Sequence, residues 1–316
     1  MTDPASTYAL LPGAEPFEAV PQEGWGADAT GTAVAGPRIG VLLCHGFTGS
    51  PQSLRPWADH LLAAGFRVSV PLLPGHGTHW SDMQRTTWRD WYGALDAALR
   101  RLLAECDQVY VTGLSMGGGL ALRLAAEHGE AISGLIVVNP SVKVNQVKEL
   151  AVPLLSRVVP SLPGIASDIK KPGASELAYD RVPLKAAAQL MSFWRTVGGD
   201  LPKVRVPVLL FRSTADHVVH ASSSALVLSR IASTDVREVL LENSYHVATL
   251  DNDAPAIFEG TVEFIRRLSA ARTGASGAAK TETETEAVGA EAVGADASRV
   301  MDPGVGSEAG SAEAHT

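Results

Sequence analysis

The stretch that decides the fold is VYVTGLSMGGGLALRLAAEH, residues 109–128. It begins as a short apolar run typical of a buried strand, and from Met116 onward its apolar residues recur at the three- and four-residue spacing of a helix. Ser115 lies at the junction, in a G-x-S-x-G pattern with Gly113 and Gly117. Residues without a Cβ let strand and helix meet in a sharp turn that exposes the serine hydroxyl at the helix N-terminus. This setting predicts a nucleophilic serine, against the alternative of a glycine-rich turn with an incidental serine.

The rest of residues 37–270 repeats this alternation of strand and helix. Apolar runs predict strands at 40–47, 66–73, 108–115, 133–140, 206–213 and 236–244, and helical spacing predicts helices at 53–64, 88–106, 116–128 and 256–271. Several strand runs are apolar on both faces, which is typical of parallel strands covered by helices on either side. The pattern therefore predicts an α/β fold with a mostly parallel twisted sheet and helices on both faces.

Three segments depart from this alternation. Residues 141–201 contain no clear strand and one helical stretch, 175–197, and an interval of that length indicates a cap or lid inserted between the strands near 133–140 and 206–213. Residues 1–36 are rich in Gly, Pro and Ala, and we expect an extended N-terminal segment with room for one edge hairpin. Residues 271–316 hold no aromatic residue and eight acidic against three basic residues, so we expect a disordered acidic tail.

Charge and cysteine content exclude several classes of protein. Of 316 residues, 34 are acidic and 26 basic, which leaves a net charge of −8 and no basic field for nucleic acid or an anionic membrane. Cys44 and Cys106 are too few for a disulfide framework or a Cys-based zinc site. The N-terminal residues lack a secretion signal, and no apolar run approaches the roughly 18 residues of a membrane span. We expect a soluble cytoplasmic protein with no nucleic-acid partner and no stable membrane insertion; the sequence predicts no particular oligomeric state.

A nucleophilic serine needs a neighbouring base, and the base needs a group that orients it. In a fold of this type the acid and then the histidine follow the serine, at the ends of later strands. Asp216 follows the predicted strand at 206–213, and His246 follows the one at 236–244. The carboxyl ends of parallel strands share one edge of a sheet, so these two residues and Ser115 are expected to converge. Asp235 and Asp251 fit less well, because one precedes a strand and the other follows the histidine.

Acyl transfer also requires N–H donors for the oxyanion of the tetrahedral intermediate. Met116, the residue after the nucleophile, supplies one, and Phe47 in the loop HGFTG (45–49) is the natural second donor. His45 is expected to organise that loop through hydrogen bonds. His76 and His79 lie three residues apart without a set of carboxylates, so we expect no metal site and no cofactor.

Five separated blocks, in this order, resemble the α/β-hydrolase superfamily: HGFTG (45–49), LPGHGTH (73–79), GLSMGG (113–118), ADHVVH (215–220) and NSYHVATLDND (243–253). More narrowly, they resemble the bacterial monoacylglycerol lipase and small carboxylesterase group over roughly 38–270. The resemblance implies that Ser115, Asp216 and His246 form a catalytic triad and that Phe47 and Met116 form the oxyanion hole. It also implies that residues 141–201 cover the active site, and it does not extend to residues 1–36 or to the acidic tail.

The expected substrates are small-molecule esters, most specifically monoacylglycerols and esters of short- to medium-chain acids. The apolar stretch 150–166 either lines an acyl channel or packs onto the body of the protein. Glu176 and Asp180 are candidates to bind the glycerol hydroxyls, and Asp180 is preferred because resembling enzymes have a lid acid at that place. A thioesterase, an amidase or a C–C bond hydrolase shares the same triad, and a non-catalytic binding protein is the alternative from another class.

Overall fold

The computed structural model describes residues 8–21, 36–143, 146–164 and 167–273. The chain divides into two compact units, Met1–Ser269 and Ala270–Thr316, and only residues 270–273 of the second are described. The expected acidic tail therefore lies almost wholly outside the described residues, as does much of the expected N-terminal segment. The fold described below is that of the first unit.

Seven strands form the central sheet in the order β1-β3-β2-β4-β5-β8-β9. They are β1 (Phe17–Ala19), β2 (Ile39–Cys44), β3 (Arg67–Val70), β4 (Gln108–Leu114), β5 (Gly134–Val138), β8 (Val208–Ser213) and β9 (Val236–Leu241). All neighbours are parallel except β1, which pairs antiparallel with β3 at the edge. All six strands that the sequence predicts are present, and β1 takes the place of the edge hairpin.

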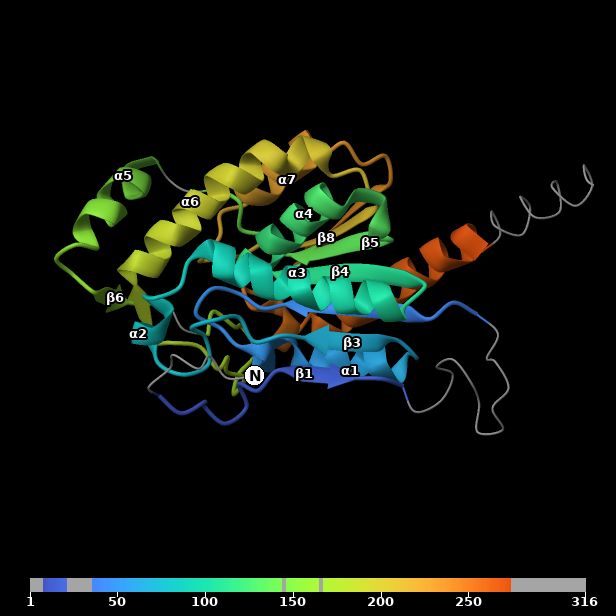
Figure 1. Cartoon of the computed structure of the whole chain (residues 1–316), viewed down its shortest axis with the longest axis horizontal. Coiled ribbons are helices and arrows are strands. Elements are labelled where there is room, and N and C mark those ends of the chain that lie inside the picture. The colour runs from blue at the N-terminus through green and yellow to red at the C-terminus, as the bar shows by residue number, and fades with distance from the viewer. Residues whose placement is uncertain (1–7, 22–35, 144–145, 165–166, 274–316) are drawn as a thin grey trace, which may run out of the picture. The chain divides into compact units, whose positions relative to one another are not determined.

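Helices cover both faces of this sheet (Figure 1). They are α1 (Arg55–Ala63), α3 (Trp88–Glu105), α4 (Met116–His128), α6 (Leu184–Asp200), α7 (Ser222–Arg230) and a final helix over 254–273. The short helix α2 (Trp80–Met83) lies beyond the sheet (Figure 1), and 3₁₀ turns are present at η1 (Pro51–Leu54), η2 (Gly129–Ala131), η3 (Leu201–Lys203) and η4 (Ala248–Leu250). Side chains of α3, α4, α6 and α7 share one buried cluster, and those of α1 and the final helix share another. The mostly parallel α/β fold is thus confirmed.

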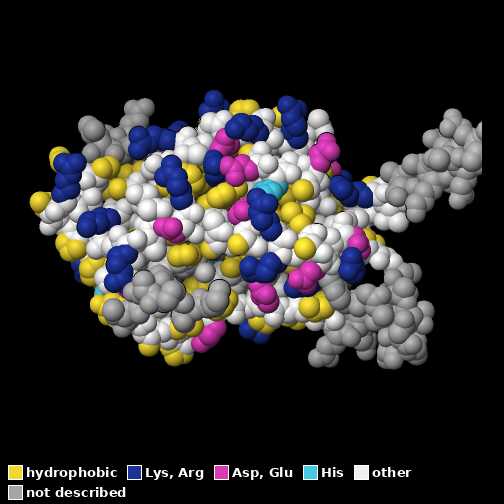
Figure 2. Space-filling model, viewed as in Figure 1, with side chains coloured by type: hydrophobic (Ala, Val, Ile, Leu, Met, Phe, Trp, Pro, Cys, Tyr) yellow, Lys and Arg dark blue, Asp and Glu magenta, His cyan; other side chains and the backbone are white. Residues whose placement is uncertain are grey.

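The interval between β5 and β8 contains α5 (Gln146–Leu155), a two-stranded sheet of β6 (Ser161–Pro163) and β7 (Arg181–Pro183), and α6. We call residues 141–201 the cap segment. Helix α5 lies against α6 at one end of the molecule (Figure 1), and it exposes Leu154 together with its neighbour Leu155; beyond it, Val158 is also exposed. Figure 2 shows hydrophobic side chains interspersed with Lys and Arg on this end. These positions of the 150–166 stretch therefore face outward rather than packing onto the body.

Three helices have no counterpart among the sequence predictions. Helix α5 contains Pro153, which interrupts the i→i−4 hydrogen bonds and obscures helical periodicity. Helix α7 begins with three serines, which have low helix propensity, and α2 is only four residues long. In each case, packing against the rest of the chain outweighs a weak local preference.

Candidate active site

The turn at Ser115 has the backbone that a nucleophile elbow requires. Strand β4 ends at Leu114, α4 begins at Met116, and Ser115 between them has φ +57°, which L-residues rarely adopt. A Cβ at Gly117 would lie 2.1 Å from the carbonyl oxygen of Cys44, so β2 and the start of α4 touch backbone to backbone. The two glycines of the G-x-S-x-G pattern permit this approach, as a Cβ at Gly113 would also lie 2.3 Å from the Gly117 carbonyl carbon.

Asp216 and His246 meet at the same edge of the sheet. Both follow the carboxyl ends of parallel strands, β8 and β9, and His246 Nδ1 lies 2.8 Å from Asp216 Oδ2. A carboxylate only accepts, so Nδ1 carries the proton and Nε2 keeps its lone pair. Both side chains are less than a tenth exposed. Such a ring is held in the tautomer that can receive a proton at Nε2.

The carboxylate of Asp216 is built to stay ionised. Burial by itself raises the pKa of Asp216, but hydrogen bonds from the His246 ring and from the N–H groups of Val219 and Val218 outweigh burial and lower it. The two N–H groups donate to Oδ1 at 2.7 and 2.8 Å, which leaves Oδ2 for the histidine. The acid therefore keeps its negative charge opposite the ring at neutral pH.

Ser115 is also buried, and among the described residues no hydrogen bond joins its Oγ to the His246 ring. In hydrolases without substrate this contact is often long and shortens in the complex. The expected convergence of strand ends is present in the topology, and the catalytic role of the three residues remains a prediction.

The two expected oxyanion donors come from segments that adjoin Ser115. Met116 is the first residue of α4, and the first N–H groups of a helix have no partner within it. Phe47 follows Gly46, whose Cβ, if present, would lie 3.5 Å from the Cβ of Ser115. The next residue of the loop, Thr48, has φ +64° and accepts a hydrogen bond from the N–H of Tyr179 in the cap segment at 3.0 Å. The cap segment thus helps to hold the loop that carries Phe47.

His45, the first residue of this loop, forms a buried pair with His76. His45 contacts the Gly46 carbonyl through Nδ1 at 3.0 Å and accepts the N–H of Leu73 at Nε2 at 3.2 Å, which agrees with its expected role as loop organiser. Burial lowers the pKa of His45 to about 4 and, together with repulsion from His45, that of His76 to about 3. Within the described residues, no group of three or more His, Cys, Asp or Glu is placed to hold a metal ion.

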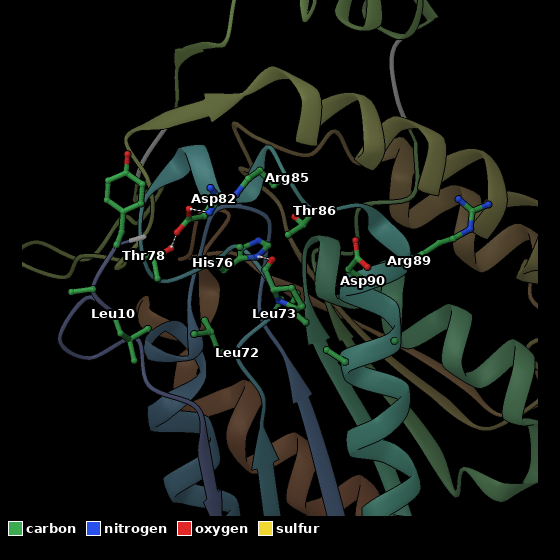
Figure 3. Close-up of a pocket in the computed structure, with 16 residues that line it drawn as sticks. Leu10, Leu72, Leu73, His76, Thr78, Asp82, Arg85, Thr86, Arg89 and Asp90 are labelled. Atoms are coloured by element: carbon green, nitrogen blue, oxygen red, sulfur yellow. Dashed lines mark hydrogen bonds and ion pairs between the residues drawn. The ribbon is translucent and has the colours of Figure 1, made fainter. Parts of the chain in front are cut away.

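His76 also lines a cavity of about 1140 Å³ (Figure 3). Its walls come from residues 8–10, from the loop after β3 and from α2 and α3. Asp82 in this wall accepts a hydrogen bond from Thr78 at 2.7 Å and pairs with Arg85. The lining includes none of the three predicted triad residues.

The structure separates the two carboxylates considered for the glycerol hydroxyls. Both belong to the cap segment, but Asp180 is exposed, whereas Glu176 lies against the loop after β2, where a Cβ at Gly49 would lie 2.7 Å from Glu176 Oε1. Burial raises the pKa of Glu176 to about 7, while the nearby ring of His246 acts in the opposite direction. The position of the side chains therefore favours Glu176 over Asp180, the residue preferred from the sequence.

Asn139 contacts the candidate site, and the sequence patterns did not single it out. It directly follows β5 in the chain and has φ +46°. Its Nδ2 donates to the carbonyl of His246 at 2.8 Å, and its Oδ1 accepts the N–H of Ser213 at 2.8 Å. One amide thereby joins the ends of three strands. The available signal was a polar residue directly after the apolar run SGLIVV (133–138), at the edge where the other site residues were expected.

Comparison with known proteins agrees with this fold. The family model of the serine aminopeptidases, S33, matches residues 35–253, and the chain belongs to this family of α/β-hydrolases. It is thus a serine hydrolase of the esterase and lipase type.

Two relatives of known name are similar to this chain over most of its length. The chain is 40% identical over 262 residues to a thermostable monoacylglycerol lipase of Bacillus sp. strain H-257, covering 82% of this chain and 97% of the relative. A carboxylesterase of Bacillus subtilis is 23% identical, with 72% and 92% covered. Among solved structures, a metagenome-derived lipolytic enzyme has 40% identity and a TM-score of 0.75, with 82% of this chain and all of that chain covered.

No described helix is long and apolar enough to cross a membrane.

Proposed function

We propose that this protein hydrolyses monoacylglycerols and other esters of short- to medium-chain acids through an acyl-enzyme on Ser115. The observation on which the proposal rests is the buried His246–Asp216 pair, 2.8 Å apart, at the sheet edge where the turn of Ser115 also lies. The substrate class is supported by the 40% identical monoacylglycerol lipase and by the carboxyl of Glu176 beside the site.

In the first half of the reaction, Ser115 Oγ attacks the ester carbonyl carbon while Nε2 of His246 takes the hydroxyl proton. The carbonyl oxygen becomes an oxyanion, which the N–H groups of Phe47 and Met116 stabilise; removing one such donor typically costs about 3–4 kcal/mol. The C–O bond to the alcohol then breaks, and the alcohol leaves with the proton held by His246. Asp216 stays ionised and stabilises the imidazolium.

In the second half, water replaces the alcohol. His246 takes a proton from the water as its oxygen attacks the acyl carbon, and the same two N–H groups hold the second oxyanion. The bond to Ser115 Oγ breaks, the serine recovers its proton from His246, and the fatty acid leaves. No cofactor or metal is required, and the expected cytoplasmic location remains a prediction.

The decisive test is Ser115→Ala. We expect turnover of monoacylglycerols and of nitrophenyl esters to fall by about 10⁴-fold or more, and labelling by a fluorophosphonate probe to disappear, because the nucleophile is removed. Ser229→Ala, at an exposed serine of α7, is the matched control and should keep both. A labelled Ser115→Ala variant would overturn the assignment of the nucleophile.

A substrate comparison tests the alcohol subsite. Glu176→Ala should raise KM for a monoacylglycerol by about tenfold, since a lost hydrogen bond in a buried site costs about 1–2 kcal/mol. It should change KM for a nitrophenyl ester much less, because that leaving group has no glycerol hydroxyls. Asp180→Ala tests the other candidate, and a larger rise in KM there than at Glu176 would contradict this subsite. Thioesters and amides in the same panel test the rival reactions on this scaffold.

A further inference from the structure

A carboxylate of the cap segment lies between the two loops that carry Asp216 and His246. Asp168 precedes β7 in the cap segment, and its side chain is only 9% exposed. Its Oδ2 accepts the backbone N–H of His246 and that of His217, each at 3.2 Å. Its Oδ1 contacts His217 Nδ1 at 2.7 Å. One side chain thus binds the histidine of the predicted triad and the residue next to its acid.

The backbone of Asp168 strengthens the same junction. Its carbonyl accepts the N–H of Val247 at 3.1 Å, so the cap segment contacts two successive residues of the histidine loop. Asn139, at the end of β5, binds the same loop through the carbonyl of His246. Asp168, in the cap segment, binds the loop through the N–H of His246.

We propose that Asp168 is a positioning residue for the Asp216–His246 pair, which makes the cap segment a structural part of the catalytic centre. The loops after β8 and β9 leave different strands, and Asp168 binds both at once. A shift of about 1 Å in such a pair can cost about a hundredfold in rate, so a shared anchor sets how often the ring faces both Asp216 and Ser115. The inference rests on the catalytic role proposed above for His246.

Asp251 provides a matched comparison. This fully buried carboxylate accepts the N–H groups of Lys170 and Lys171 in the cap segment at 2.7 and 2.9 Å, and that of Tyr245 in the histidine loop at 2.8 Å. It therefore fastens the same segment to the same loop. Unlike Asp168, it makes no hydrogen bond to His217 or His246 among the described residues.

The experiment compares Asp168→Asn with Asp251→Asn on nitrophenyl butyrate, so that an error about monoacylglycerols as substrates does not affect it. For Asp168→Asn we expect kcat to fall by about tenfold to a hundredfold with KM within about threefold. Asp168→Glu keeps the carboxylate that accepts these hydrogen bonds and should recover a large part of kcat.

Asp251→Asn is expected to lower the melting temperature and to leave kcat within about threefold. Equal losses of kcat in the two Asn variants would show that Asp168 only fastens the cap segment, and would overturn the proposal. A full kcat in Asp168→Asn would do the same. If the Asn variant does not fold, Asp168→Ser, which also removes the charge, takes its place in every comparison.

Discussion

At position 117 a single hydrogen atom, in place of a methyl group, allows the turn beneath Ser115 to form. The Cβ of an alanine there would lie 2.1 Å from the Cys44 carbonyl oxygen, and backbone cannot move aside as a flexible side chain can. We expect Gly117→Ala to lower the free energy of unfolding by about 3 kcal/mol or more, measured by urea denaturation, and to abolish esterase activity.

Gly93 in α3 is the control for this residue-scale prediction. No heavy atom lies within 4 Å of where its Cβ would be, so Gly93→Ala should stabilise the protein by about 0.5–1 kcal/mol through helix propensity alone. Two glycine-to-alanine changes of opposite sign would separate crowding at the turn from a general sensitivity of glycines. A Gly117→Ala variant as stable as the original would contradict the backbone contact.

At the scale of elements, α3 depends on a capping box at its start. The Thr87 side chain accepts the N–H of Asp90, and Asp90 accepts the N–H of Thr87 at 2.7 Å. Thr87→Ala should therefore cost about 1 kcal/mol and lower the melting temperature by roughly 2–4 °C. The same helix carries Trp91, whose ring lies 6.0 Å from that of Phe47, so an early loss of α3 would also loosen the oxyanion loop.

Thr196→Ala is the matched control, because Thr196 lies inside α6 and donates only to the carbonyl one turn earlier. Alanine has the higher helix propensity, so little or no loss of stability is expected. If the two substitutions lowered the melting temperature equally, the capping box would contribute nothing particular to α3.

For the molecule as a whole, the buried histidine pair predicts sensitivity to acid. The pKa of His45, lowered to about 4, and that of His76, lowered to about 3, mean that the folded state holds both rings neutral below the ordinary value near 6.5. In that range the unfolded chain binds more protons than the folded one. The stability is therefore fully present above pH 6.5 and is lost as the pH falls toward 4, by up to about 1.4 kcal/mol per pH unit for each ring.

Urea denaturation between pH 7 and pH 4 measures this slope. His76→Phe, which cannot be protonated, should flatten it, whereas His60→Gln on the partly exposed side of α1 should leave it unchanged.

Removal of residues 275–316 is a second whole-chain prediction, and turnover should stay nearly unchanged because the segment has no large apolar anchor. A loss of activity in the truncated chain would contradict it.

The sequence by itself determined the features that are local or periodic. Alternating apolar runs and helical spacing predicted the six parallel-sheet strands, because burial on both faces leaves its mark on every residue of a strand. The turn at Ser115 was readable for a similar reason, since its glycines stand beside the serine in the chain. The order of Asp216 and His246 at strand ends followed from parallel topology.

Only the tertiary structure decided which distant groups meet. Asp168 reaches His246 across 78 residues, Asn139 reaches it across 107, and the choice of Glu176 over Asp180 depends on how the cap segment folds over the loop after β2. Such contacts follow from the packing of loops and short helices, such as α5 with its Pro153, whose local preferences are weak. The path of a loop depends on the tertiary contacts that it and its two ends make. These contacts leave no periodic pattern in the sequence.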